Sequence, residues 1–190
     1  MLRMAESPGI NEPQHYTRTA IVMHWLIGML LIAEIAFGFL LDEIAPRRTP
    51  ARAATINLHK SLGVLLLVLV VARIWWGLRH RPPAWPASMP SWQQAAAEWV
   101  HRTMYACMLV APLSGYIASN FSKHGLMVLG ARFPPWGPDL PKVYEVLNRL
   151  HDVTAYILAV LVVGHVLIAL KHAWIDRDAM FARMWKSAPR

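Results

Sequence analysis

Four long apolar segments, separated by short polar loops, limit what this chain can fold into. They run from Ala20 to Leu41, Ile56 to Leu78, Thr103 to Ser122 and Val153 to Leu170. With their flanks, and at a rise of about 1.5 Å per residue, they are long enough to cross a hydrocarbon core about 30 Å thick. The sequence therefore predicts an all-α, integral membrane four-helix bundle in a single domain, residues 1–190, with helices at about 19–42, 56–79, 98–121 and 147–175.

Composition excludes several other classes of protein. Hydrophobic residues make up 56% of the chain and charged residues 16%, against about 45–50% and about 25% in soluble domains. This composition disfavours a soluble enzyme and excludes a disordered chain. The single cysteine, Cys107, excludes a disulfide framework and any cluster built from several thiolates. The net charge of +8 does not indicate nucleic-acid binding, because the basic residues are spread between the apolar segments rather than gathered.

The loop charges predict an orientation. An even number of spans places both termini on one side of the membrane. The termini and the loop between the second and third spans carry 11 Lys and Arg residues, against 8 on the other side. Positive residues favour the cytoplasmic side, so both termini are expected in the cytoplasm. The first span is too long for a signal-peptide core and no small-residue cleavage site follows it, so it is expected to be retained.

Histidines are unusually frequent: the chain has nine of them and only eleven Asp and Glu residues. Ionisable groups at membrane depth are costly and usually functional. His151 and His165 lie on nearly the same face of the fourth helix, roughly 21 Å apart along its axis. The topology puts His24 at the depth of His165, and His59 at the depth of His151. Two bis-histidine pairs result, and facing imidazoles in a helix bundle are an established way to hold haem iron.

Other interpretations of these histidines are weaker or stay open. A zinc site normally gathers three or four ligands at one depth, whereas this chain offers pairs at two depths. A single histidine at a helix end is more often an interfacial or capping group than a ligand. His80 and His101 lie at the cytoplasmic depth and are alternatives to His24 as ligands. His124, in an external loop, is an alternative to His59.

Three charged residues, Glu34, Lys60 and Arg73, lie within the expected spans. Arg73 falls at the depth of His24 and His165, where it is expected either to pair with a haem propionate or to extend to lipid phosphate. Glu34, deep in the first span, is an expensive residue at that position. The sequence offers it no evident partner and predicts no role for it.

Several short motifs together resemble the bacterial cytochrome b561 family, which shares its four-helix core with the cytochrome b subunits of nickel-iron hydrogenases. The resemblance covers roughly Thr17 to Trp185. The motifs are His24-Trp25-Leu26, Ile56-Asn57-Leu58-His59-Lys60-Ser61, Val71-Ala72-Arg73 with Trp75-Trp76, and His151 with Gly164-His165.

The resemblance implies a bundle in the bacterial inner membrane with two non-covalent haem b groups. Its ligand positions match His24, His59, His151 and His165. Short members include a superoxide oxidase, which takes electrons from superoxide on the periplasmic side and gives them to ubiquinone. The external loop of this chain has no close match in that type.

Two further histidines match positions of the short type. His101 and His172 correspond to histidines that lie outside the ligand set and near its proposed quinone region. Imidazoles at the cytoplasmic depth are also suited to binding a quinone carbonyl and delivering a proton. Both residues are therefore expected to serve quinone reduction, against the alternative of interfacial histidines with no partner.

Three functions compete at this point. The first is superoxide oxidation coupled to ubiquinone reduction. The second is an electron-transfer subunit linking a periplasmic redox protein to the quinone pool. The third is a non-redox membrane protein whose histidines bind metal or are only interfacial.

The external loops favour capture of a small anion. They carry eight basic and five acidic residues, a net of 8 − 5 = +3, and a positive surface beside a haem aids capture of superoxide. Lys60, Lys123 and Arg132 are the expected catalytic residues for this steering. The alternative is that they only anchor lipid headgroups.

Overall fold

The computed structural model describes residues 15–86, 89–123, 125–177 and 179–185, and four long helices dominate it. These are α1 (Arg18–Phe39), α3 (Ala51–Arg79), α4 (Ser91–Asn120) and α5 (Pro141–Lys171). Shorter elements join or follow them. They are α2 (Leu41–Ile44), the strands β1 (Leu126–Val128) and β2 (Ala131–Phe133), the π-helix η1 (His172–Asp176) and α6 (Ala179–Ala182).

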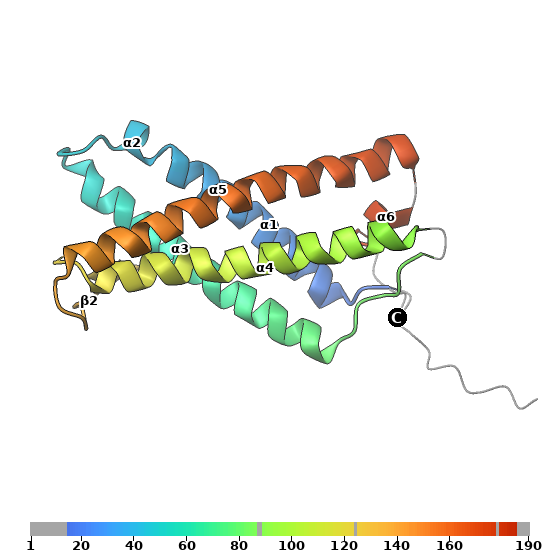
Figure 1. Ribbon diagram of the computed structural model, residues 1–190, viewed down its shortest axis with the longest axis horizontal. Coiled ribbons are helices and arrows are strands. Elements are labelled where there is room, and N and C mark those ends of the chain that lie inside the picture. The colour runs from blue at the N-terminus through green and yellow to red at the C-terminus, as the bar shows by residue number, and fades with distance from the viewer. Residues whose placement is uncertain (1–14, 87–88, 124, 178, 186–190) are drawn as a thin grey trace, which may run out of the picture.

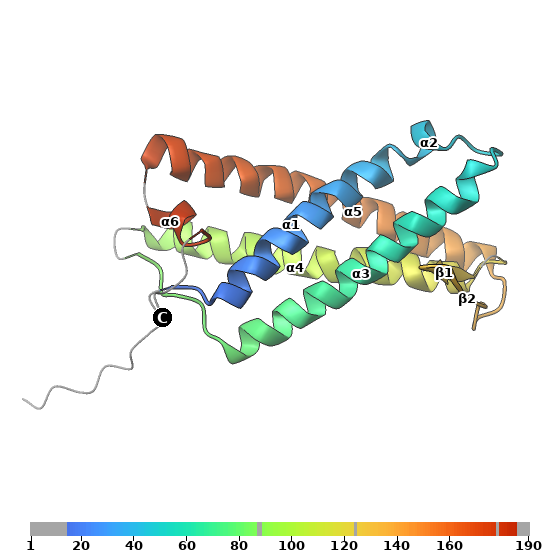
Figure 2. The ribbon, with the colours of Figure 1, turned by 180° about the vertical axis from the view of Figure 1, so that it is seen from behind.

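The long helices form two layers. Figure 1 shows α4 and α5 side by side, and Figure 2, from behind, shows α1 and α3 crossing them. α4 packs along α5, α1 packs against α3, and α3 joins the layers by contacting α4, whereas α1 and α5 touch only sparingly. α2 and the β-hairpin lie at one end of the bundle, the hairpin end. α6 and the connection from α3 to α4 lie at the other, the terminal end (Figure 1).

Three of the helices begin earlier than the apolar periodicity predicts. α3, α4 and α5 start before residues 56, 98 and 147, at positions marked by Pro50, Pro90 and Pro141. Proline fits the first helical turn because its fixed φ suits a helix and its missing N–H has no partner there. As a result, His59 and His101 lie well inside their helices and not at the first turn.

Within the described ranges, three helices are long and apolar enough to cross a membrane: α1, α3, and α5 continued by η1. α4 is less apolar: its first half carries polar and charged residues, and its second half contains buried polar residues such as Ser114 and Ser119. Their hydroxyls donate to carbonyls of the same helix, Ser114 to Ala111 at 2.9 Å and Ser119 to Gly115 at 2.9 Å. The chain is thus a helical membrane bundle whose least apolar helix satisfies these polar groups internally.

An apolar core fills the middle of the bundle and draws on all four long helices. Val70 is its most buried side chain, with 1% exposed. Many other aliphatic side chains face outward, as expected for helices surrounded by lipid. The buried cluster comprises Ile27, Leu31, Leu66, Val70, Met104, Cys107, Leu158 and Val162.

The hairpin was not anticipated from the sequence. Its strands pair antiparallel around Leu129 and Gly130, which both have positive φ, as two-residue hairpin turns require. The hairpin is fixed to α3 on both sides. Leu129 N–H donates to Ser61 Oγ at 3.1 Å, and Lys60 Nζ donates to the Gly125 carbonyl at 3.2 Å. It therefore covers the part of α3 that carries His59.

Candidate functional site

Two histidines face each other across the layers at the hairpin end. His59 on α3 and His151 on α5 have ring centroids 5.9 Å apart and ring planes at 89°. Two imidazoles on opposite sides of one metal ion, each bonded at about 2 Å, have centroids roughly 6 Å apart. The spacing of this pair therefore fits a single iron held between the rings.

Each ring of this pair is oriented through Nδ1. His151 Nδ1 lies 2.7 Å from the Ala111 carbonyl oxygen on α4. His59 Nδ1 lies 2.8 Å from Glu34 Oε1 on α1. A metal-bound histidine usually donates its other ring N–H to a carbonyl or a carboxylate, which fixes the tautomer. The His151 contact is a hydrogen bond, whereas His59 Nδ1 and Glu34 Oε1 are at bonding distance without the alignment of one. In both rings the oxygen lies beside Nδ1, which leaves Nε2 for a metal.

Two glycines let neighbouring helices approach these rings. A Cβ added at Gly38 on α1 would lie 3.2 Å from His59 Cε1, and one at Gly115 on α4 would lie 3.1 Å from His151 Nδ1. Both distances are shorter than ordinary van der Waals contact, so only glycine fits without displacing the ring. Sequence reasoning missed them; the one available signal was glycine within an apolar span, where small residues mark close helix approach.

The second histidine group lies at the terminal end. His24 on α1 and His165 on α5 have ring centroids 6.1 Å apart at 72°, and His101 on α4 lies 5.4 Å from His165. The structure thus brings together the predicted pair and its predicted alternative. In the described part of the chain, no cluster of three or more His, Cys, Asp or Glu side chains has the geometry to hold a metal ion. The arrangement is one of pairs.

Arg73 extends into the bundle at this end. Its Nε donates to the Tyr105 hydroxyl at 2.9 Å, and its Nη1 donates to the Ala20 carbonyl at 2.6 Å. These bonds tie α3 to α4 and α1, and they place a fixed positive charge one turn from His24. Tyr16, just before α1, is half-buried nearby, and burial raises the pKa of its phenol, so the hydroxyl stays neutral.

The remaining histidines are placed apart from the two pairs. His80 stacks on Trp76 at 3.9 Å, and its Nδ1 lies 3.1 Å from the Trp76 carbonyl, so it closes the end of α3 and is no substitute for His24. His172 lies in η1 with Nδ1 3.4 Å from Asp176 Oδ2. His124, the predicted alternative to His59, lies outside the described residues.

The three predicted steering residues differ in their surroundings. Lys60 is half-buried, and its ammonium group is used in holding Gly125 of the hairpin loop. Lys123 is exposed, with Nζ 3.7 Å from Asp139 Oδ2. Arg132, on β2, is also exposed. The structure therefore leaves Lys123 and Arg132 at the surface of the hairpin end, and gives Lys60 a part in the fold.

The donors at both ends suit haem iron better than a closed zinc site. The hairpin end offers two facing imidazoles and the terminal end offers two with His101 beside them, whereas structural zinc sites need four ligands. α5 contributes one histidine to each pair, His151 and His165, which lie roughly 21 Å apart along its axis. The apolar core fills the space between the two ends. The arrangement can hold two separate redox centres on opposite sides of a membrane.

Comparisons with known proteins match nearly the whole chain to one family. The family described as prokaryotic cytochrome b561 matches residues 15–187. Cytochrome b561 homolog 2 of Escherichia coli (strain K12) is 29% identical over 175 residues, which cover 92% of this chain and 93% of the relative. Cytochrome b561 homolog 1 of the same organism is 25% identical over 169 residues, covering 89% and 96%.

Proposed function

The chain belongs to the prokaryotic cytochrome b561 family, and from this premise we propose that it oxidises superoxide at the hairpin end and reduces ubiquinone at the terminal end. Members of the family bind haem b and transfer electrons in membranes. The observation that carries the proposal is the presence of two histidine pairs, with centroids 5.9 and 6.1 Å apart, at opposite ends of one bundle.

In this proposal the chain holds two haem b groups without covalent bonds. His59 and His151 would hold one, and His24 and His165 the other. The only cysteine, Cys107, is buried in the core, so no thioether attachment is available. Haem, when bound, supplies a centre that accepts and donates single electrons. The helices orient the imidazoles, and their apolar core fills the space between the two ends.

The orientation follows from the loop charges. We place both termini in the cytoplasm and the hairpin end in the periplasm of a bacterial inner membrane, because 11 of the 19 Lys and Arg residues fall on the terminal side. α4 completes the four spans. It runs alongside α5, and the hydroxyls of Ser114 and Ser119 bond within the helix, which lowers their cost in lipid.

Superoxide is the proposed donor because the exposed groups at the hairpin end suit a small anion. Lys123 and Arg132 are exposed there, and the external loops carry a net charge of 8 − 5 = +3. A positive surface raises the local concentration of an anion and its rate of encounter. No soluble domain is present in the described residues to dock a large protein donor.

We expect superoxide to reduce the haems of the purified protein rapidly at low salt. The rate should fall as ionic strength shortens the screening length from about 10 Å to about 3 Å. Lys123→Ala and Arg132→Ala should each slow haem reduction roughly two- to five-fold, because each removes one attracting charge. Stopped-flow absorbance of the haem bands measures this rate.

The matched control is Arg81→Ala, which removes the same charge from an exposed position at the terminal end. It should leave the rate of reduction by superoxide unchanged. A preparation with both haems bound that superoxide cannot reduce would reject the donor. It would favour the second function, a subunit that conducts electrons from a periplasmic redox protein to the quinone pool.

Ubiquinone reduction is expected to need His101 and His172. Quinone binding requires a polar group near the interface, and proton delivery to the reduced quinone requires a protonatable one. Alanine at either position should slow ubiquinone reduction at least about tenfold while the haem spectrum stays intact. His80→Ala, at the same end but stacked on Trp76, is the control. Unchanged quinone kinetics in both variants would reject this assignment.

A further inference from the structure

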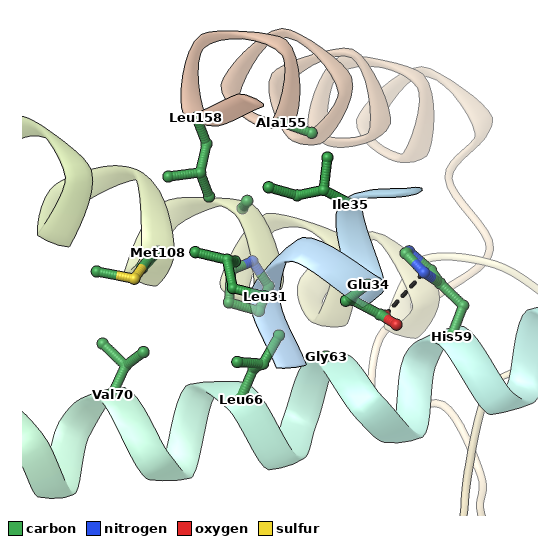
Figure 3. A pocket seen from close by; sticks show the side chains of 12 residues that line it. Leu31, Glu34, Ile35, His59, Gly63, Leu66, Val70, Met108, Ala155 and Leu158 are labelled. Atoms are coloured by element: carbon green, nitrogen blue, oxygen red, sulfur yellow. Dashed lines mark ion pairs between the residues drawn. The ribbon is translucent and has the colours of Figure 1, made fainter. Parts of the chain in front are cut away.

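Among the described residues, Glu34 is the one buried carboxylate, and the proposed electron path does not use it. Only 7% of it is exposed, at a depth in α1 where an ionised group is costly. Figure 3 shows its carboxylate turned toward His59, with Oε1 2.8 Å from Nδ1. The two residues line one side of a cavity of about 80 Å³ whose other walls are mostly apolar, including Leu31, Leu66 and Leu158.

We propose that Glu34 is a positioning residue for His59 that lowers the midpoint potential of the haem at the hairpin end. The inference rests on the proposed function in one respect, the assignment of a haem to His59 and His151. It adds a role for a residue outside the ligand set and a direction for electron flow.

The first step of the argument is the location of the proton. A histidine bonded to iron through Nε2 carries its proton on Nδ1, so Nδ1 is a donor. The atom at 2.8 Å must then accept, and a carboxylate oxygen is a strong acceptor. In the structure the two atoms are at bonding distance but not aligned as a hydrogen bond, and we infer that the ring turns to donate to Oε1 when Nε2 is bonded to iron. Such a partner fixes the ring and makes the imidazole more basic.

The second step is the charge. Neither oxygen of Glu34 has an aligned hydrogen-bond partner among the described residues, and His59, with Nδ1 2.8 Å from Oε1, is the group there that can offset the carboxylate. A more basic ligand and a nearby negative charge both stabilise the oxidised, more positive iron. Reduction removes that positive charge and weakens both interactions. The midpoint potential of this haem is therefore lowered.

The third step is the difference between the two ends. His151 is held by a neutral carbonyl, that of Ala111, so the negative charge acts on one side of one site. In the part of the chain that the structure describes, neither His24 nor His165 forms an ion pair with a carboxylate. Instead Arg73, a cation, is hydrogen-bonded one turn from His24. The hairpin-end haem thus has the lower potential, and electrons entering there move downhill toward the terminal end.

The test is a redox titration of the purified, haem-loaded protein carrying Glu34→Gln. Glutamine keeps an oxygen that can accept from Nδ1 but removes the charge, so both haems should stay bound. One midpoint potential should rise and the other stay unchanged, and the EPR signal of one low-spin ferric haem should move. Glu34→Ala removes the acceptor as well and should raise the same potential further. Glu43→Gln makes the same chemical change at an exposed position in α2 and should move neither potential.

Unchanged potentials and EPR signals in a fully loaded Glu34→Gln protein would overturn the proposal. If that variant loses a haem, Glu34→Asp decides: loading restored by the shorter carboxylate supports the role at His59, and continued loss shows that Glu34 only fills space. Failure of the proposed function looks different. The titration uses chemical mediators and no superoxide, so a wrong donor leaves it unaffected. A missing hairpin-end haem would already show in the unsubstituted protein.

Discussion

Replacing His59 or His151 with alanine is expected to remove the haem at the hairpin end, and replacing His24 or His165 is expected to remove the one at the terminal end. Each substitution deletes one of the two imidazoles that would hold the iron, whose rings face each other at 5.9 Å at the hairpin end and 6.1 Å at the terminal end. Pyridine haemochrome analysis of pure protein should fall from about two haems to about one per chain.

His80→Ala serves as the control, since its ring stacks on Trp76 and leaves both pairs intact. At the terminal end His24 and His101 are alternative ligands, because the ring of His101 lies 5.4 Å from that of His165. If His101→Ala removed a haem and His24→Ala did not, α4 and not α1 would supply the ligand. A stoichiometry of zero or one haem in the unsubstituted chain would refute the double-pair assignment itself.

Adding a single methyl group beside either ring of the hairpin-end pair is expected to weaken haem binding there. Alanine at Gly38 would bring Cβ to 3.2 Å from His59, and alanine at Gly115 would bring it to 3.1 Å from His151. Overpacking of this kind costs about 1–3 kcal/mol, or roughly 5- to 150-fold in affinity for haem. Titration of the haem-depleted protein with haem, followed by absorbance, measures the affinity.

Gly28→Ala is the matched control for Gly38→Ala, because it lies on the same helix and its Cβ would meet no atom within 4 Å. Gly164→Ala is a second control: it adds a methyl group in open space on α5, the helix that carries His151. Both should keep normal haem content and affinity. Equal losses in Gly28→Ala and Gly38→Ala would show that the effect comes from α1 as a whole and not from contact with His59.

Much of the fold could be predicted because lipid imposes a minimum length on each apolar helix. That constraint placed the start of α1 well. It did not predict where α3, α4 and α5 begin, because their first turns lie outside the apolar segments, next to Pro50, Pro90 and Pro141. Nor did it predict the hairpin, whose position depends on side-chain bonds from Ser61, far away in the sequence.

The histidine pairs could be predicted because depth follows from topology and helical rise alone. The groups around them could not, because sideways contact between helices depends on how each helix is rotated. Glu34 had no partner in the sequence and has His59 in the structure. Lys60 is predicted to attract superoxide, and the structure adds a bond from its ammonium group to the Gly125 carbonyl. Spacing along one helix carries no information about either contact.

α5 supplies one histidine to each pair, and this determines the order in which the protein can be assembled. Helices emerge from the ribosome in sequence, so α1, α3 and α4 reach the membrane before His151 and His165 have been made. Neither pair exists until the last long helix arrives, so in the proposed assignment haem would enter an almost finished bundle. α1 and α5 contact each other only sparingly. A haem held by His24 and His165 would therefore join these two helices, and the chain would lack that connection until haem is bound.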